Sequence, residues 1–217
     1  MSSTNDYMNK VIRIRNSNLS KDYSNVIFRY VDGKLRVIPV SYGYHYGDLG
    51  KGRDTYFWDI DSSNRSTGHY GTGTYFFSEE AKDKDLFKSD RPLHKVNFNE
   101  YNLFKPRNET DAFILHSGLR AVNYIRDFDN QTFEHMKIML MANGVKNDDI
   151  GRALSKVKQT YYSSKYQNSP FDAKLDSMST VFMKELGYNG IDVRNIKGYD
   201  NSSYGSVIYD LDKKKKK

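Results

Sequence analysis

The sequence predicts a domain of the α+β class, with strands toward both ends of the chain and helices between them. Three observations support this. Apolar and polar residues alternate in the first half, amphipathic segments with helical spacing occupy the middle, and strand-like stretches return near the end. The length of 217 residues suits a single domain, which we expect over residues 1–212, followed by a disordered lysine tail at 213–217.

The first half is predicted to hold strands joined by loops. "NVIFRYVDGKLRVIPV" contains two alternating runs around Asp32-Gly33, a pair typical of a two-residue hairpin turn because glycine tolerates the positive φ required there. Residues 41–73 lack a clean period and are interpreted as loop with short strands. Ser78 is expected to cap a short helix over residues 79–87. The other predicted strands are residues 10–16, 74–78 and 94–104.

The middle is predicted to be helical, and strands follow it. Phe113, Leu115, Leu119, Val122 and Ile125 recur on one face of the first helical segment. Glycines after the second and fourth segments provide stops. The four helical segments are residues 110–128, 132–144, 147–165 and 171–187. The final strands are expected within residues 189–195 and 203–212, where they would close the sheet begun by the first half.

Composition restricts the classes of function. The formal charge is +7, but Lys213 to Lys217 supply five of these charges, so nucleic-acid binding is expected only through this tail. Without cysteine, the chain has no disulfide or thiolate chemistry. No long apolar run or signal peptide is visible in the sequence, which predicts no membrane partner. We expect a cytoplasmic protein of a bacterial cell, or a virus-associated one.

The stretch "STGHYGTGTYFFS", Ser66 to Ser78, combines three glycines, a histidine and four aromatic residues. Gly71 and Gly73 would let a planar group approach the backbone, and Tyr75 would stand beside them at the start of a strand. A strand follows the glycines here, whereas the dinucleotide fingerprint needs a helix. From the residues alone, a glycine-rich turn leading into an edge strand is favoured over a ligand site.

Beyond these residues, "GTGTYFFSEEA" resembles the Gly-x-Gly-x-Tyr-Phe segment of the ADP-ribosyltransferases. "PLHKVNFNEYNLFKP" and "LGYNGIDVRN…SSYGSVIYDLD" are similar to later strands of that family, in the same order. The resemblance spans roughly residues 29–210 and implies a split β-sheet or β-sandwich core with a central helical segment. It also implies NAD as the substrate and an unknown protein or small-molecule acceptor for ADP-ribose.

The resemblance also implies roles for individual residues. The Gly71–Thr72–Gly73 backbone would line the nicotinamide pocket, and Tyr75 would stack on the nicotinamide ring. The histidine branch of the family would use His45 from "SYGYHYGDLG" to bind the adenosine-side ribose. The other branch has a first-strand arginine and a Ser-Thr motif, for which the candidates are Arg29, Ser66 and Thr67. Arg65 could pair with the pyrophosphate.

The family's catalytic glutamate is not found in this chain. It would fall near Gly205 or Ser206, and "NSSYGSVIYD" contains no acid before Asp210. Asp200 is the candidate substitute, Asp192 lies on the preceding strand, and Glu185 is more distant. Family members without the glutamate are mono-transferases or have lost catalysis. The alternative to an enzyme is therefore a catalytically inactive binding or structural module of the same fold.

Overall fold

The structure is a computed structural model that describes residues 26–31, 34–39, 41–46, 70–78, 93–163, 175–194, 196 and 206–211. The chain divides into two units, Met1–Ser41 and Tyr42–Lys217. Helices and strands occur together, so the predicted α+β class is confirmed. The single domain over residues 1–212 stays a prediction. The strand expected at 10–16, the helix at 79–87 and the lysine tail lie outside the described residues.

The described part of the first unit is a hairpin. Strand β1 (Val26–Val31) pairs with β2 (Lys34–Pro39) in antiparallel register, and Val31 lies opposite Lys34. Two residues, Asp32 and Gly33, therefore separate the paired ends, as the sequence predicts.

The second unit contains two small sheets. Strand β3 (Tyr42–Tyr46) pairs antiparallel with β5 (Leu93–Asn97). The four strands of the other sheet are, in spatial order, β4 (Thr74–Phe76), β8 (Ser206–Ile208), β7 (Gly190–Ile191) and β6 (Leu103–Phe104). Only the β6–β7 pair is parallel in this sheet. The two C-terminal strands thus lie between two earlier strands, which agrees with the expected closure of the sheet.

The stretch predicted as one strand over residues 94–104 is interrupted. After β5 the chain forms a short 3₁₀ helix, η2 (Phe98–Glu100), before β6 begins. The Asn97 side chain accepts a hydrogen bond from the Asn99 amide, which caps η2 and turns the chain. This local capping ends the alternation that suggested a continuous strand, so that prediction is wrong.

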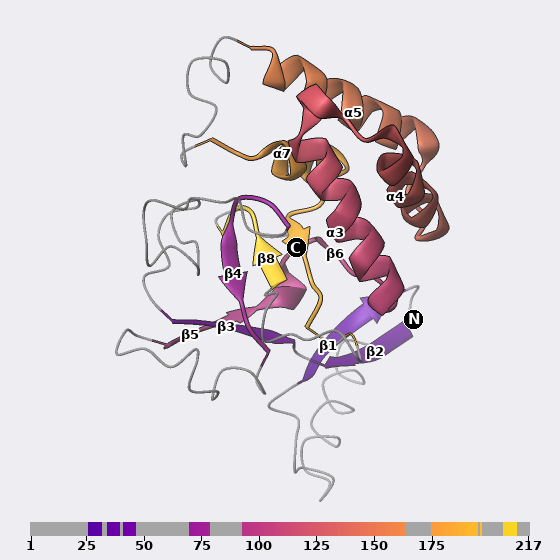
Figure 1. Cartoon of the computed structure of the whole chain (residues 1–217). Coiled ribbons are helices and arrows are strands. Elements are labelled where there is room, and N and C mark those ends of the chain that lie inside the picture. The colour runs from indigo at the N-terminus through magenta and orange to yellow at the C-terminus, as the bar shows by residue number, and fades with distance from the viewer. Residues whose placement is uncertain are drawn as a thin grey trace, which may run out of the picture. The chain divides into compact units, whose positions relative to one another are not determined.

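Helices occupy the chain between β6 and β7, as predicted, and Figure 1 shows them gathered beside the four-stranded sheet. Helix α3 packs on α4 and α7, and α5 packs on α7. Side chains of Asn108, Asp129 and Ser177 cap the amino ends of α3, α4 and α7. The helices are α3 (Glu109–Asn123), η3 (Ile125–Asp127), α4 (Asn130–Ala142), α5 (Asn147–Tyr161) and α7 (Met178–Glu185).

Three details of the helical prediction change. The segment predicted as one helix over residues 110–128 divides into α3, which ends at Asn123, and the 3₁₀ helix η3. Phe113 was placed on the buried face of α3, but it is 64% exposed, whereas Leu115, Leu119 and Val122 are fully buried. Helix α7 begins only at Met178, because the Ser177 hydroxyl accepts the Thr180 amide and starts the helix there. Among the described helices, none combines the length and the apolar character needed to cross a membrane.

The four-stranded sheet separates two apolar clusters. Tyr75 and Val207 belong to the larger cluster, which includes the buried faces of α3, α4, α5 and α7. Phe76 and Ile208 belong to a smaller cluster with Phe98 from η2. Successive residues of a strand point to opposite faces, so β4 and β8 each contribute to both clusters.

Candidate functional site

Three of the segments that the resemblance assigned to one site, those of β3, β4 and β8, lie next to one another in the second unit (Figure 1). Tyr75 of β4 is paired with Val207 of β8, the strand expected to close the sheet. On the other side of β4, Phe77 exchanges two backbone hydrogen bonds of 2.8 and 3.0 Å with Tyr44 of β3. The histidine strand, the Gly-x-Gly-x-Tyr-Phe strand and the closing strand are therefore neighbours.

His45 contacts Tyr75 through the main chain. Its Nδ1 lies 2.9 Å from the Tyr75 carbonyl oxygen, and its ring lies 5.8 Å, centroid to centroid, from the Phe76 ring. A carbonyl oxygen can only accept a hydrogen bond, so this contact requires a proton on Nδ1. His45 is 2% exposed. The predicted histidine thus meets the predicted tyrosine strand, although the two side chains lie on opposite faces of β4.

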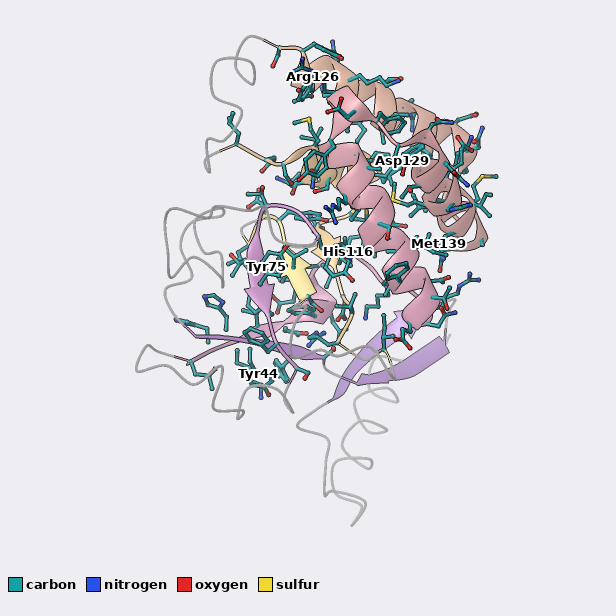
Figure 2. The ribbon with its side chains drawn as sticks, viewed as in Figure 1. Tyr44, Tyr75, His116, Arg126, Asp129 and Met139 are labelled. Carbon is teal, nitrogen blue, oxygen red and sulfur yellow. The ribbon has the colours of Figure 1, made fainter. Side chains whose placement is uncertain are left out.

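The Tyr75 ring is a core side chain. It is 1% exposed and belongs to the larger apolar cluster together with buried residues of α3, and Figure 2 labels it at β4. Its hydroxyl donates to the Gly71 carbonyl oxygen at 2.7 Å. The ring is therefore not exposed in this structure, and its stacking on nicotinamide stays a prediction. The alternation along β4 directs Tyr75 inward, toward the cluster that the helices complete.

The two glycines make room for other parts of the same chain. Gly71 has φ +109°, and a Cβ there would lie 2.4 Å from Thr180 Oγ1 of α7. A Cβ on Gly73 would lie 2.6 Å from the Ile208 carbonyl oxygen of β8. Between them, the Thr72 amide donates to Thr180 Oγ1. The close approach that glycine allows is thus made by α7 and β8.

Ser206 stands on the closing strand where the family's glutamate would be expected. It lies opposite Phe76 in register and is fully buried. Its hydroxyl oxygen accepts the Val193 amide at 2.9 Å and lies 3.1 Å from Asp192 Oδ1, to which it donates. A carboxylate therefore does lie beside this position, but it belongs to Asp192.

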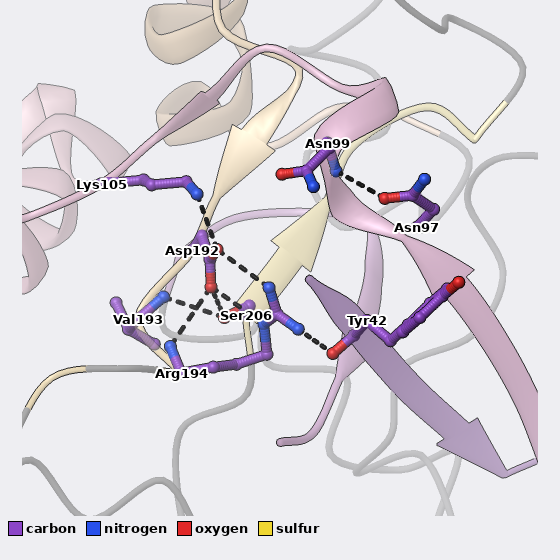
Figure 3. A network of polar contacts seen from close by, with 8 residues as sticks. All are labelled: Tyr42, Asn97, Asn99, Lys105, Asp192, Val193, Arg194 and Ser206. Carbon is purple, nitrogen blue, oxygen red and sulfur yellow. Dashed lines mark hydrogen bonds and ion pairs between the residues drawn. The ribbon is translucent and has the colours of Figure 1, made fainter. Parts of the chain in front are cut away.

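Asp192 is held in a buried ion pair (Figure 3). Arg194 donates from Nε and Nη2 to the two carboxylate oxygens, at 2.9 Å each, and Lys105 Nζ lies 3.5 Å away. Burial alone would raise the pKa of Asp192. The hydrogen bonds and the charge of Arg194, with the charge of Lys105, outweigh burial and hold this pKa below its ordinary value. Asp192 is accordingly ionised, and Arg194 donates a hydrogen bond to each of its carboxylate oxygens.

Arg194 also joins elements that are far apart in the sequence. Its guanidinium carbon lies 3.7 Å from the centroid of the Phe98 ring, and its Nη1 donates to the Tyr42 carbonyl oxygen of β3. Sequence reasoning missed this group. The signal was available in "GIDVRN", because opposite charges two residues apart in extended backbone lie on the same face.

The remaining predicted site residues lie in the first unit or outside the described residues. Arg29 lies on β1 of the first unit, opposite Arg36, and its side chain is outside the described part. Arg65, Ser66, Thr67 and Asp200 also lie outside the described residues. Within the described segments, the His, Asp and Glu side chains form no group of three that could hold a metal ion.

Comparisons with protein-family models, with curated proteins and with solved structures found no match for this chain.

Proposed function

We propose that this chain is an ADP-ribosyltransferase-like protein of the histidine branch that binds NAD. The hydrogen bond between His45 Nδ1 and the Tyr75 carbonyl oxygen is the observation that carries the proposal. The resemblance requires a histidine beside the Gly-x-Gly-x-Tyr-Phe strand, and His45 satisfies this requirement. The adjacency of β3, β4 and β8 is a second support, because the resemblance draws its residues from these three strands.

The contact with Tyr75 also determines how His45 would meet a ligand. With the proton on Nδ1, the other nitrogen of a neutral ring, Nε2, is a hydrogen-bond acceptor. A ribose hydroxyl of NAD would donate to Nε2. Because His45 is buried, NAD would reach its ring only after covering groups move, so we expect association slower than at an open site.

Transfer of ADP-ribose needs more than binding. The bond between nicotinamide and ribose breaks, nicotinamide leaves with the electron pair, and an acceptor nucleophile bonds to the ribose carbon and loses a proton. A carboxylate near the oxocarbenium-like transition state would stabilise its positive charge. Asp192 is committed to Arg194, so Asp200 remains the candidate for this acid in the proposal. The acceptor would be a protein or a small molecule.

A second candidate function is a catalytically inactive module of the same fold. Ser206 favours this second function, because it stands on β8 where the resemblance leads us to expect an acid. Its hydroxyl donates a hydrogen bond to Asp192. Such a module would bind NAD or a partner without cleaving NAD.

A labelling experiment separates the active enzyme from the inactive module. The protein is incubated, with and without cell lysate, with NAD that is labelled in the nicotinamide and in the adenosine. An enzyme releases labelled nicotinamide and attaches labelled ADP-ribose to an acceptor, and Asp200→Asn should reduce both by at least about tenfold. An inactive NAD-binding module gives a thermal shift with NAD but no release. If NAD causes neither release nor a thermal shift, the NAD proposal is wrong.

A further inference from the structure

The turn that precedes β4 is held by the side chain of Tyr75 itself. The Tyr75 hydroxyl donates to the Gly71 carbonyl oxygen at 2.7 Å and accepts the Tyr70 amide at 3.1 Å. One side chain thus closes a loop on main-chain groups four and five residues earlier. Both bonds are buried, so no solvent replaces them when the hydroxyl is absent.

A second tyrosine reaches the same turn from the closing strand. Tyr209 follows β8, and its hydroxyl donates to the Tyr70 carbonyl oxygen at 2.9 Å. Burial raises the pKa of Tyr209 well above its ordinary value, and neighbouring Tyr75 adds to this, so the hydroxyl remains protonated and able to donate. The amide and the carbonyl of Tyr70 are therefore bound by two different tyrosines.

Helix α7 holds the other side of the turn. The Thr72 amide donates to Thr180 Oγ1 at 2.6 Å and to Ser177 Oγ at 3.1 Å, and the Ser177 amide donates to Thr72 Oγ1 at 2.9 Å. Gly71 lies between these contacts with its positive φ. Side chains from β4, the end of β8 and α7 together impose one backbone conformation on Tyr70–Thr72.

We propose that Tyr75 serves NAD binding as a positioning residue, through its hydroxyl and the Tyr70–Thr72 turn, rather than as a ring that stacks on nicotinamide. This inference rests on the proposed function. Its basis is that the ring is buried in the core while the hydroxyl makes two buried bonds to the turn. The conformation of the turn, which the resemblance assigns to the nicotinamide pocket, is then set by the Tyr75 hydroxyl, with Tyr209 and α7 as supports.

Tyr75→Phe separates the two roles, because phenylalanine keeps the ring and removes the hydroxyl. Stacking predicts that Tyr75→Phe binds NAD like the wild type. Positioning predicts a dissociation constant at least about tenfold higher, because two buried hydrogen bonds are lost and the loss of even one corresponds to about this factor. Tyr209→Phe should weaken binding in the same direction, because it frees the Tyr70 carbonyl. Binding of NAD to Tyr75→Phe within twofold of the wild type would overturn the inference.

Tyr101→Phe is the matched control for a general loss of stability. Tyr101 is also buried, and its hydroxyl donates to a main-chain oxygen, that of Leu211, at 2.9 Å, but it does not bond to the turn. We expect Tyr101→Phe to keep its NAD affinity within about twofold of the wild type, since no hydrogen bond of the turn is lost. If Tyr101→Phe weakens NAD binding as much as Tyr75→Phe does, the effect is not specific to the turn and the inference fails.

Amide hydrogen exchange in the free protein provides a measurement that does not need NAD. Losing the Tyr75 hydroxyl should raise exchange at the Tyr70 and Thr72 amides by about tenfold in Tyr75→Phe, and by little in Tyr101→Phe. Unchanged exchange at the Tyr70 amide would contradict the role of the Tyr75 hydroxyl in holding the turn. If the wild type does not bind NAD but exchange rises as expected, the proposed function and the role of Tyr75 in NAD binding fail, while the hydrogen bonds that hold the turn are verified.

Discussion

Removal of the Arg194 side chain should be among the most destabilising single changes in the second unit. Arg194 and Asp192 have side chains only 4% and 3% exposed, and Arg194 also stacks on Phe98 and binds the Tyr42 carbonyl. In Arg194→Ala the Asp192 carboxylate remains buried, and among the described residues its nearby counter-charge is the Lys105 ammonium, whose side chain is 54% exposed.

The size of the effect follows from this burial. Breaking a buried ion pair by removing one partner costs about 3–5 kcal/mol, which is a large part of the roughly 5–15 kcal/mol that stabilises a typical domain. Arg194→Lys keeps the charge but loses the planar fork that binds both carboxylate oxygens, so we expect an intermediate loss of about 1.5–3 kcal/mol. This variant keeps the test informative if Arg194→Ala does not fold.

Urea unfolding followed by circular dichroism measures these differences, because urea, unlike guanidinium, does not screen charges. The matched control is Arg152→Ala, which removes an exposed partner of Asp149 on α5 and should change stability by less than about 0.5 kcal/mol. A second check is Asp192→Leu combined with Arg194→Met, which should be more stable than Arg194→Met alone because no charge is left buried. If Arg194→Ala lowers the free energy of unfolding by no more than Arg152→Ala does, the buried Asp192–Arg194 pair does not stabilise the second unit.

Two further effects should follow from the same structure. The folded-state pKa of Asp192 is depressed, so its stabilisation is present above the unfolded value of about 3.9 and is lost as pH falls through the folded pKa. Unfolding free energy measured between about pH 6 and pH 2.5 should therefore fall less steeply in Asp192→Asn than in the wild type, and equal slopes would contradict this. Gly71→Ala should cost at least about 2 kcal/mol, since it adds a contact with Thr180 to the strain of a positive φ, whereas Gly144→Ala at φ +87°, with nothing within 4 Å, should cost only about 1–2 kcal/mol. Equal losses of unfolding free energy in Gly71→Ala and Gly144→Ala would mean that the contact between the turn and α7 does not add to the cost of the substitution.

The elements predicted best are those specified by local signals. The Asp32-Gly33 hairpin is specified by its turn residues, and the stop of α4 by Asn143-Gly144, where Gly144 takes φ +87°. Apolar spacing identifies the buried face of α3 except at Phe113. Exposure of a residue at the edge of such a face depends on where α4 and α7 pack, and periodicity does not contain that information.

The candidate site shows a different limit. The order of segments predicted that His45 and Tyr75 belong together, and they touch. The role of Tyr75 was assigned from a pattern that fixes the strand but not the direction of the side chain. Direction depends on which face of β4 the helices cover, and helices and sheet meet only through long-range packing. The Asp192–Arg194 pair is indicated in the sequence by two opposite charges two residues apart. Its burial, however, depends on contacts with β3 and η2, which are distant in the sequence.

Calorimetric titration with NAD tests whether His45 belongs to an NAD site. The proteins to compare are the wild type, His45→Ala and His135→Ala. His135 lies exposed on α4, so its removal controls for the loss of a histidine as such. We predict saturable binding with a stoichiometry of about one for the wild type and for His135→Ala. His45→Ala should bind at least about tenfold more weakly, because it removes both the contact with Tyr75 and the acceptor for the ribose hydroxyl. If the wild type does not bind NAD, or if His45→Ala binds NAD with equal affinity, the proposed NAD site at His45 is wrong.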